Sequence, residues 1–211
     1  MSRILALDIS TSAGWALLDT ENPSGAEYGL IKLPRRMRDF GDHSHPWGYI
    51  YGAVEMAELL MARVRVTQYD ILVIEETNGS RSRMSQKALE YIHACFLSLF
   101  KLEFPARVND VKYVNTSDWR KITETKMSAL DKNRNAKLSR HKHKASAKGE
   151  KLDKKALGIA GRTTIKHVAI RRANEIFGLN LIAKDDDLAD ALLLAYAVSL
   201  GVKQCKGGDY E

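Results

Sequence analysis

Four acidic residues lie where burial or a shared helix face makes their charge unfavourable. Asp8 interrupts the apolar run RILALDI, and Glu75 follows the apolar run ILVI. Asp187 and Asp190 are three positions apart at the start of the last apolar run, so on a helix they share one face. Carboxylates gathered in one place repel one another at low dielectric, unless cations neutralise them.

Oxygen ligands of this kind are typical of sites for hard divalent cations. All-oxygen ligation favours Mg²⁺ or Mn²⁺ over Zn²⁺, which prefers nitrogen and sulfur. Two such ions about 4 Å apart can bind a phosphodiester, activate a water molecule on one side and stabilise the leaving oxygen on the other. The acidic set therefore indicates hydrolysis of phosphodiesters at a site with two metal ions.

Each acid also has a simpler explanation. Asp8 could accept hydrogen bonds from the turn that follows it, and Glu75 could mark the exposed end of a strand. Helix N-termini favour carboxylates, which accounts for Asp185 and Asp186 as capping or first-turn residues. This explanation fits Asp190 less well, because the apolar period carries that residue toward the buried side. The set is more informative than any one of its members.

A basic segment would provide a surface for the same kind of substrate. Between Lys126 and Lys155 there are 11 Lys and Arg residues against three acidic ones, whereas the other residues include 22 basic and 23 acidic side chains. A nearly neutral body with one basic segment suggests a polyanionic partner, most commonly nucleic acid. A solvated lysine-rich loop that aids solubility is the alternative. Because bulky apolar residues are scarce, we predict a mobile insertion over about 124–160, or a loop ordered by its ligand.

The elements that must position the acids follow from the apolar pattern. Three apolar runs near the N-terminus, with the turn-rich ENPSG between the second and third, predict an antiparallel meander. ILVI is too apolar for an exposed edge and predicts a central parallel strand. Strand–helix units and terminal helices follow, which predicts an α/β fold with a mixed central sheet of about five strands flanked by helices. The predicted strands are 3–9, 13–20, 27–33, 70–76 and 106–115; the predicted helices are 49–65, 84–101, a short one capped by Thr116 or Ser117, one from Thr163 or Thr164 to Phe177, and the last apolar run.

The motifs LDISTSAGWALLD, ILVIEET, VKYVNTSDWRK and DLADALLLAYA, in this order and rough spacing, resemble those of RuvC-type Holliday junction resolvases, especially the phage and viral branch. The resemblance covers nearly the whole chain except residues 35–48 and the basic segment. It implies a single domain with a ribonuclease H-like fold. It also implies that the catalytic, metal-binding acids are Asp8, Glu75, Asp187 and Asp190, with Asp186 as the alternative to Asp187 because three consecutive aspartates leave the register open.

The activity that the resemblance implies is Mg²⁺-dependent hydrolysis at a four-way DNA junction or other branched DNA. Two ions would occupy each active site, Mn²⁺ would substitute for Mg²⁺, and the products would carry 5′-phosphate ends. The implied assembly is a homodimer with contacts along residues 84–101, because a twofold junction is matched by a twofold protein. The apolar residues of that helix could equally belong to the core. Another ribonuclease H-like nuclease, acting on RNA–DNA hybrids or flaps, and a non-catalytic DNA-binding scaffold are the alternatives.

Basic residues in three places are the predicted DNA contacts. Bacterial members of the family carry an aromatic residue shortly after the strand glutamate, whereas this chain reads ETNG at 76–79. Nearby arginines and a lysine would contact phosphates instead, Lys166 would lie near the scissile phosphate, and the basic segment would add salt-sensitive contacts. The predicted DNA-binding residues are Arg81, Arg83, Lys87, Lys137, Arg140, Lys142, Lys144 and Lys166.

The composition excludes several other classes of protein. The chain is 45% hydrophobic and 28% charged, as expected of a soluble globular protein. No apolar run approaches the roughly 18 residues of a membrane span. Two cysteines are too few for a disulfide framework or a cysteine-rich zinc site, so we predict a cytoplasmic protein, in the host cytoplasm if it is of phage origin. An actin-like kinase, suggested by LDISTSAG, would need a second domain for which 211 residues leave no room.

Overall fold

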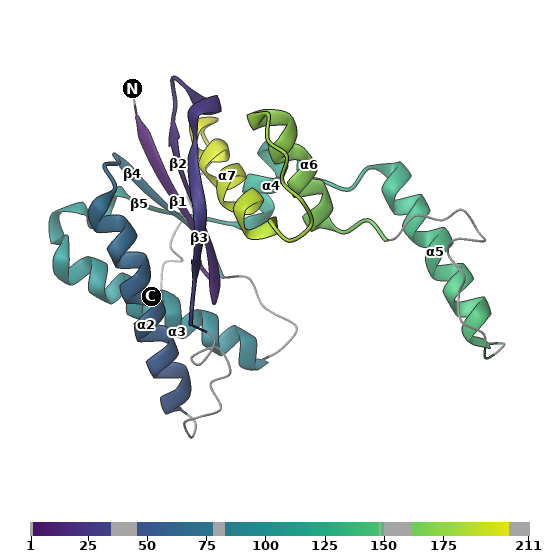
Figure 1. Ribbon diagram of the computed structural model, residues 1–211, viewed down its shortest axis with the longest axis horizontal. Coiled ribbons are helices and arrows are strands. Elements are labelled where there is room, and N and C mark those ends of the chain that lie inside the picture. The colour runs from purple at the N-terminus through teal and green to yellow at the C-terminus, as the bar shows by residue number, and fades with distance from the viewer. Residues whose placement is uncertain (1, 35–45, 78–82, 148, 150–161, 203–211) are drawn as a thin grey trace, which may run out of the picture.

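The computed structural model describes residues 2–34, 46–77, 83–147, 149 and 162–202 of the chain (Figure 1). Within this part of the chain, five strands form a single mixed sheet in the order β3-β2-β1-β4-β5. The strands are β1 (Arg3–Asp8), β2 (Ser12–Asp19), β3 (Glu27–Lys32), β4 (Ile71–Glu75) and β5 (Val111–Val114). A short 3₁₀ helix, η1 (Pro23–Gly25), lies between β2 and β3. The predicted mixed sheet of about five strands flanked by helices is confirmed.

The strand pairing brings two of the four acids to one edge of the sheet. β1 is antiparallel to β2 and parallel to β4, with Leu7 opposite Ile74. β4 is in turn parallel to β5. Parallel pairing brings the C-terminal ends of these three strands to the same edge, and Asp8 and Glu75 are the last residues of β1 and β4.

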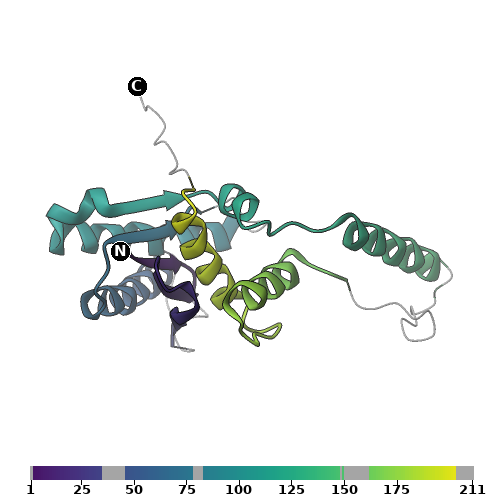
Figure 2. The same ribbon diagram turned by 90° about the horizontal axis from the view of Figure 1, so that it is seen from above.

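Helices cover both faces of the sheet (Figures 1 and 2). One face is covered by α2 (Trp47–Val66) and α3 (Arg83–Glu103), and the other by α4 (Thr116–Ile122), α6 (Ile165–Phe177) and α7 (Asp186–Ser199). Ala6 of β1 and Val73 of β4 belong to the core on the α7 side. Since side chains alternate along a strand, Asp8 and Glu75, two residues further on, face the same side.

Two segments differ from the sequence-based prediction. Residues Pro105–Asp110 form a 3₁₀ helix, η2, so the strand predicted over 106–115 is confined to β5. The basic segment, predicted as a loop or mobile insertion over about 124–160, contains the helix α5 (Ala129–Ala147), whereas residues 148 and 150–160 lie outside the described residues. Its first turn is closed by Ser128, whose hydroxyl accepts from the Asp131 N–H at 3.0 Å and donates to the Asp131 carboxylate at 2.8 Å. This capping arrangement, followed by strong helix formers such as Ala, Lys, Leu and Arg, explains a helix that has no broad apolar face.

The other predicted helices are present, but the predicted cap of α4 is wrong: Asn115, not Thr116 or Ser117, caps it, and its side-chain oxygen accepts from the Ser117 N–H at 2.9 Å. Thr164 caps α6 with a reciprocal pair of hydrogen bonds to His167, as the sequence predicted for Thr163 or Thr164. On α3, Ile92 and Phe96 are fully buried in the core beneath the sheet, so these two residues do not lie on a free surface; the homodimer stays a prediction. None of the helices in the described ranges has the length and hydrophobicity needed to cross a membrane.

Candidate active site

The start of α7 lies against β2 because the strand has a glycine at the point of contact. Gly14 is opposite Asp8 in the β1–β2 pair. A Cβ atom added to Gly14 would lie only 1.9 Å from the backbone carbonyl oxygen of Asp187. Only a residue without a side chain allows this approach, which brings the first turn of α7 next to the last residue of β1.

Asp8 lies among the other three predicted acids. Its pKa is raised well above the usual value, first because the carboxyl is withdrawn from water, and then because of the negative charges of Glu75, Asp190 and Asp187. Lys166 partly offsets these charges. The Asp8 carboxylate offers oxygen ligands, and a cation bound there would neutralise the negative charge of Asp8 and its neighbours.

Glu75 is held in place by residues of the segment after β5. The Thr116 hydroxyl, at the start of α4, donates a hydrogen bond to Glu75 Oε1. Withdrawal from water raises the pKa of Glu75, whereas this hydrogen bond and the nearby guanidinium of Arg120 lower it. The next acid, Glu76, accepts from Asn115 Nδ2 at 2.7 Å, so the two successive glutamates have separate partners.

Asp190 is the most deeply buried acid of the group, with 8% of its surface exposed. Its Oδ2 atom lies 3.5 Å from Arg120 Nη2, while its Oδ1 atom is buried without a hydrogen-bond partner. Burial raises the pKa of Asp190 to about 7, since the Arg120 charge offsets it only in part. The apolar period of α7 predicted this burial, and the structure confirms it.

The two aspartates of the first turn of α7 have different surroundings. Asp186 forms an ion pair with Lys166 of α6. Asp187 is partly buried, which raises its pKa, and the Ser12 hydroxyl opposes the shift through a hydrogen bond. The charge of Asp187 acts on Asp8, so the arrangement favours Asp187 over Asp186 as the partner of Asp8.

The donor set fits a hard divalent cation in type and charge. All four side chains offer carboxylate oxygens, and the unpartnered Oδ1 atom of Asp190 is a buried acceptor available to an ion. Within the described ranges, however, no three His, Cys, Asp or Glu side chains are arranged as they stand to hold one metal ion. Binding of an ion by these acids therefore requires their side chains to rearrange.

The predicted DNA-binding residues fall into three groups. Arg81 lies outside the described residues, and the side chain of Arg83, the first residue of α3, is not described. Lys87 is partly buried on α3. Lys166 is exposed but directed at the acids, since its pKa is raised by Asp186 first and further by Asp187 and Asp190. The remaining four, Lys137, Arg140, Lys142 and Lys144, are exposed on α5.

Several residues that shape the site are not among those predicted from the sequence. Arg120 contacts Asp190, and Thr116 contacts Glu75. Gly14 allows the close approach of α7 to β2. The motif TSDWRK predicts a capped helix after the last strand but does not by itself assign these residues to the site. Its place at the end of a parallel strand, beside the edge where ligands bind in such sheets, was the available signal.

Comparison with known proteins identifies the fold. No protein-family model and no curated protein matches the sequence. The chain is similar to the solved structure of T. thermophilus RuvC in complex with a Holliday junction substrate, with a TM-score of 0.53 and 12% identity over 97% of this chain and 99% of that one. Thermus thermophilus RuvC is similar with a TM-score of 0.46 and 14% identity over 96% of this chain and 98% of that one. The yeast mitochondrial Holliday junction resolvase Ydc2 is similar with a TM-score of 0.46 and 11% identity over 94% of this chain and 79% of that one. The first similarity confirms the ribonuclease H-like fold over nearly the whole chain.

Proposed function

We propose that this protein is a metal-dependent, structure-selective DNA endonuclease that cuts four-way junctions and other branched DNA. The observation that carries the proposal is the position of Asp8, whose carboxyl is withdrawn from water among Glu75, Asp187 and Asp190 at one edge of the sheet. The fold shared with a RuvC structure bound to a Holliday junction substrate supports the choice of DNA. So does the local excess of basic residues around α5.

Asp8, Glu75, Asp187 and Asp190 would hold the cations, for which Mg²⁺ is the expected metal and Mn²⁺ a substitute. When bound, two such ions supply Lewis-acid stabilisation of the phosphodiester and a water molecule acidified for attack. The ions would also neutralise four carboxylates that otherwise repel one another. Asp190 would contribute the Oδ1 atom that has no partner in the protein.

Three neighbouring residues would orient the acids and the substrate. Thr116 fixes the rotamer of Glu75 through its hydroxyl, and Arg120 holds one oxygen of Asp190 so that the other stays free. Lys166 is tied to Asp186 but 60% exposed, so its ammonium group can approach a phosphate oxygen beside the acids. These residues would position groups rather than transfer protons.

Further features of the proposed enzyme follow from the same resemblance. The products would carry 5′-phosphate ends, and the functional unit would be a homodimer that cuts two strands symmetrically. A phage or viral origin and a role in recombination, or in debranching replicated DNA, complete the proposal.

The proposal is tested by cleavage of a labelled synthetic four-way junction in Mg²⁺, in Mn²⁺ and in EDTA. The wild-type protein should cut in either metal and not in EDTA. Asp8→Asn and Asp190→Asn should each lower the rate roughly 100-fold or more, because ligand loss removes several kcal/mol of transition-state stabilisation. Binding of the junction should persist in both variants.

The matched control is Asp110→Asn, which removes an exposed carboxylate that pairs with Arg107 just before β5. This variant should cut at the wild-type rate, because Asp110 lies at the N-terminal end of β5, whereas the acids lie at the C-terminal ends of the parallel strands. Cleavage of an RNA–DNA hybrid duplex in place of the junction would favour the alternative nuclease. A wild-type protein that cuts neither substrate in either metal would contradict the proposal.

A further inference from the structure

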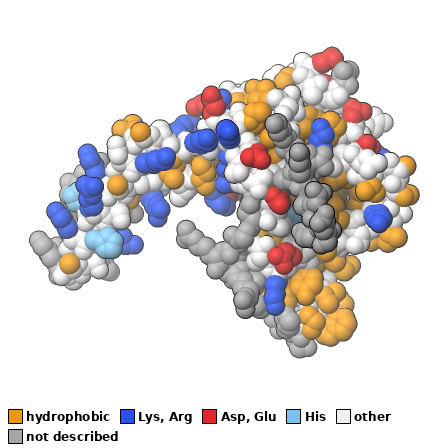
Figure 3. Space-filling view, turned by 180° about the vertical axis from the view of Figure 1, so that it is seen from behind, with side chains coloured by type: hydrophobic (Ala, Val, Ile, Leu, Met, Phe, Trp, Pro, Cys, Tyr) orange, Lys and Arg blue, Asp and Glu red, His pale blue; other side chains and the backbone are white. Residues whose placement is uncertain are grey.

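The helix α5 stands away from the body of the protein as an arm (Figures 1 and 2). It has 19 residues, so it is about 28 Å long at 1.5 Å per residue. Lys and Arg side chains follow the arm along its length (Figure 3). Six of its residues are Lys or Arg and only Asp131 is acidic: the six are Lys132, Arg134, Lys137, Arg140, Lys142 and Lys144.

Two sides of α5 differ in exposure and in charge. Asp131, Asn135 and Leu138, at positions i, i+4 and i+7, are buried or partly buried. Lys137, Arg140 and Lys144, at positions i, i+3 and i+7, are all exposed and share another face. At 100° per residue the centres of the two faces are roughly opposite. We call the second set the basic face; its residues present a row of cations with no acidic residue of α5 among them.

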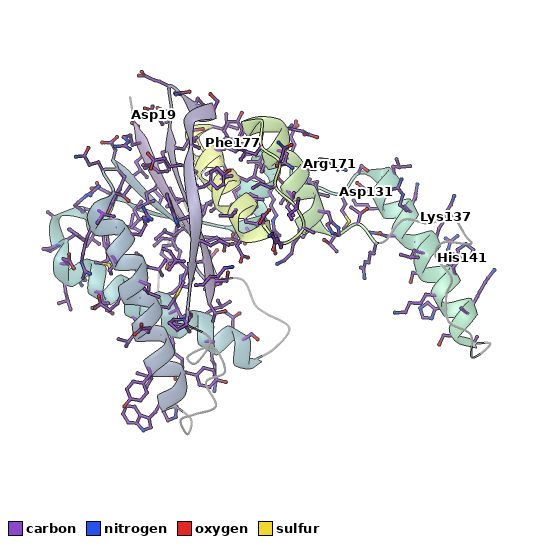
Figure 4. The ribbon with its side chains drawn as sticks, in the orientation of Figure 1. Asp19, Asp131, Lys137, His141, Arg171 and Phe177 are labelled. Carbon is purple, nitrogen blue, oxygen red and sulfur yellow. The ribbon has the colours of Figure 1, made fainter. Side chains whose placement is uncertain are left out.

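The base of the arm is joined to the start of α6 by specific contacts. The Asn135 side chain donates to the Thr163 carbonyl at 2.7 Å and accepts from the Thr163 N–H at 3.0 Å. Arg171 of α6 lies 3.7 Å from the Asp131 carboxylate, and Figure 4 shows this pair at the base of the arm with Lys137 and His141 further out. These two hydrogen bonds, with the ion pair one turn earlier on α5, hold this part of the helix against α6 and the segment that leads into it.

We infer that α5 is a DNA-binding arm whose basic face contacts the phosphates of a duplex segment other than the one that lies at the acids, in a direction set by Asn135. The inference rests on the proposed function and deepens it, since it assigns selectivity for branched DNA to this arm. Cations that recur every three or four residues along one side of a helix suit the regular row of phosphates along a duplex. Phosphate contacts position DNA without reading its sequence, which matches a structure-selective enzyme.

The test compares two triple variants of the full chain that lose the same charge from the basic segment. The first, Lys137→Gln, Arg140→Gln and Lys144→Gln, removes the basic face. The second, Lys126→Gln, Lys132→Gln and Arg134→Gln, removes three exposed cations that do not share that face and are not among the predicted DNA contacts. Gln keeps helix propensity close to that of Lys and Arg, and circular dichroism confirms that the helix content is retained.

Binding to a four-way junction is measured in EDTA over a series of salt concentrations. The basic-face variant should reduce the slope of log K against log salt by about 2.7, the value for three lost phosphate contacts, whereas the control variant should change it far less. Asn135→Ala, which keeps every charge, should lower the preference for the junction over a linear duplex. Equal losses in the two triple variants, or an unchanged slope in the first, would overturn the inference.

The design separates this inference from the proposed function. Binding in EDTA involves no cleavage, so a wild-type protein that binds through the basic face but never cuts would contradict only the nuclease. A protein that cuts junctions in Mg²⁺ while both triple variants bind like the wild type would contradict only the arm.

Discussion

At the scale of single residues, Asp190 is a buried acid whose charge the surrounding protein compensates only in part. The residue is buried, one of its oxygens has no partner, and Arg120 neutralises it incompletely. The pKa of an aspartate in an unfolded chain is about 3.9. In the folded protein the pKa of Asp190 is about 7, so folding favours the protonated acid.

This shift predicts how stability depends on pH in EDTA. Between the two pKa values the folded state holds a proton that the unfolded state has lost, so the free energy of unfolding falls as the pH rises from about 4 through about 7. The raised pKa values of Asp8 and Glu75 act in the same direction. Asp190→Asn should therefore be more stable than the wild type at pH 8, by at most about 4 kcal/mol, and should lose this advantage at pH 4.

Urea unfolding at a series of pH values measures this difference. Asp110→Asn is again the control, because it breaks only an exposed ion pair with Arg107, worth about 1 kcal/mol or less. Its free energy of unfolding should follow the pH dependence of the wild type. If the Asp190 variant did so too, Asp190 would not be a buried, poorly compensated acid.

At the scale of elements, the site depends on how closely α7 approaches β2. Gly14→Ala would place a methyl group 1.9 Å from the Asp187 carbonyl, against backbone that cannot rotate away. The variant should lose about 1–3 kcal/mol of stability, as overpacked cores do, and should also cut junctions more slowly because Asp187 and Asp190 shift away from Asp8. Thermal unfolding and the cleavage assay measure the two effects.

The comparison variant is Gly25→Ala, whose added methyl group would meet only the side chain of Asn22, 2.8 Å away. That side chain is able to move, so the change should be nearly neutral for both stability and cleavage. A Gly14 variant that is as stable and as active as the Gly25 variant would show that the close approach does not control the site.

The elements also show which parts of the molecule could be predicted from sequence. The strands that end in Asp8 and Glu75, and the helix that begins at Asp186, have apolar patterns strong enough to identify them. The helix α5 does not follow from the apolar pattern, because bulky apolar residues are scarce in this segment. The sequence feature that indicates a helix there is the capping pair Ser128 and Asp131. Short-range sequence patterns locate elements, but they do not show which side chains from distant elements meet.

Arg120 illustrates the last point. It lies 70 positions before Asp190 in the chain, and its contact with that residue depends on the packing of α4 against α7. No spacing rule within one helix or strand predicts such a contact. The close approach at Gly14 was unpredictable for the same reason, although the need for a small residue there is clear once the packing is known.

At the scale of the whole molecule, the proposed chemistry and the proposed DNA contacts lie in different parts of one fold. The acids occupy one edge of a sheet covered on both faces, whereas the basic face lies on an arm joined to α6 (Figures 1 and 4). α6 also carries Lys166, which is directed at the acids. One helix therefore connects the part that would hold the substrate to the part that would cut it.

The most direct test of the central claim is the anomalous signal of Mn²⁺ in crystals of the full chain grown or soaked in that ion. The account predicts peaks about 2.1 Å from carboxylate oxygens of Asp8, Glu75 and Asp190, with Asp187 completing the ligands. It also predicts that Asp190 Oδ1 becomes a ligand while Oδ2 keeps its contact with Arg120. Crystals that show no peak among these acids at saturating Mn²⁺, with Asp8 turned away from α7, would contradict the account.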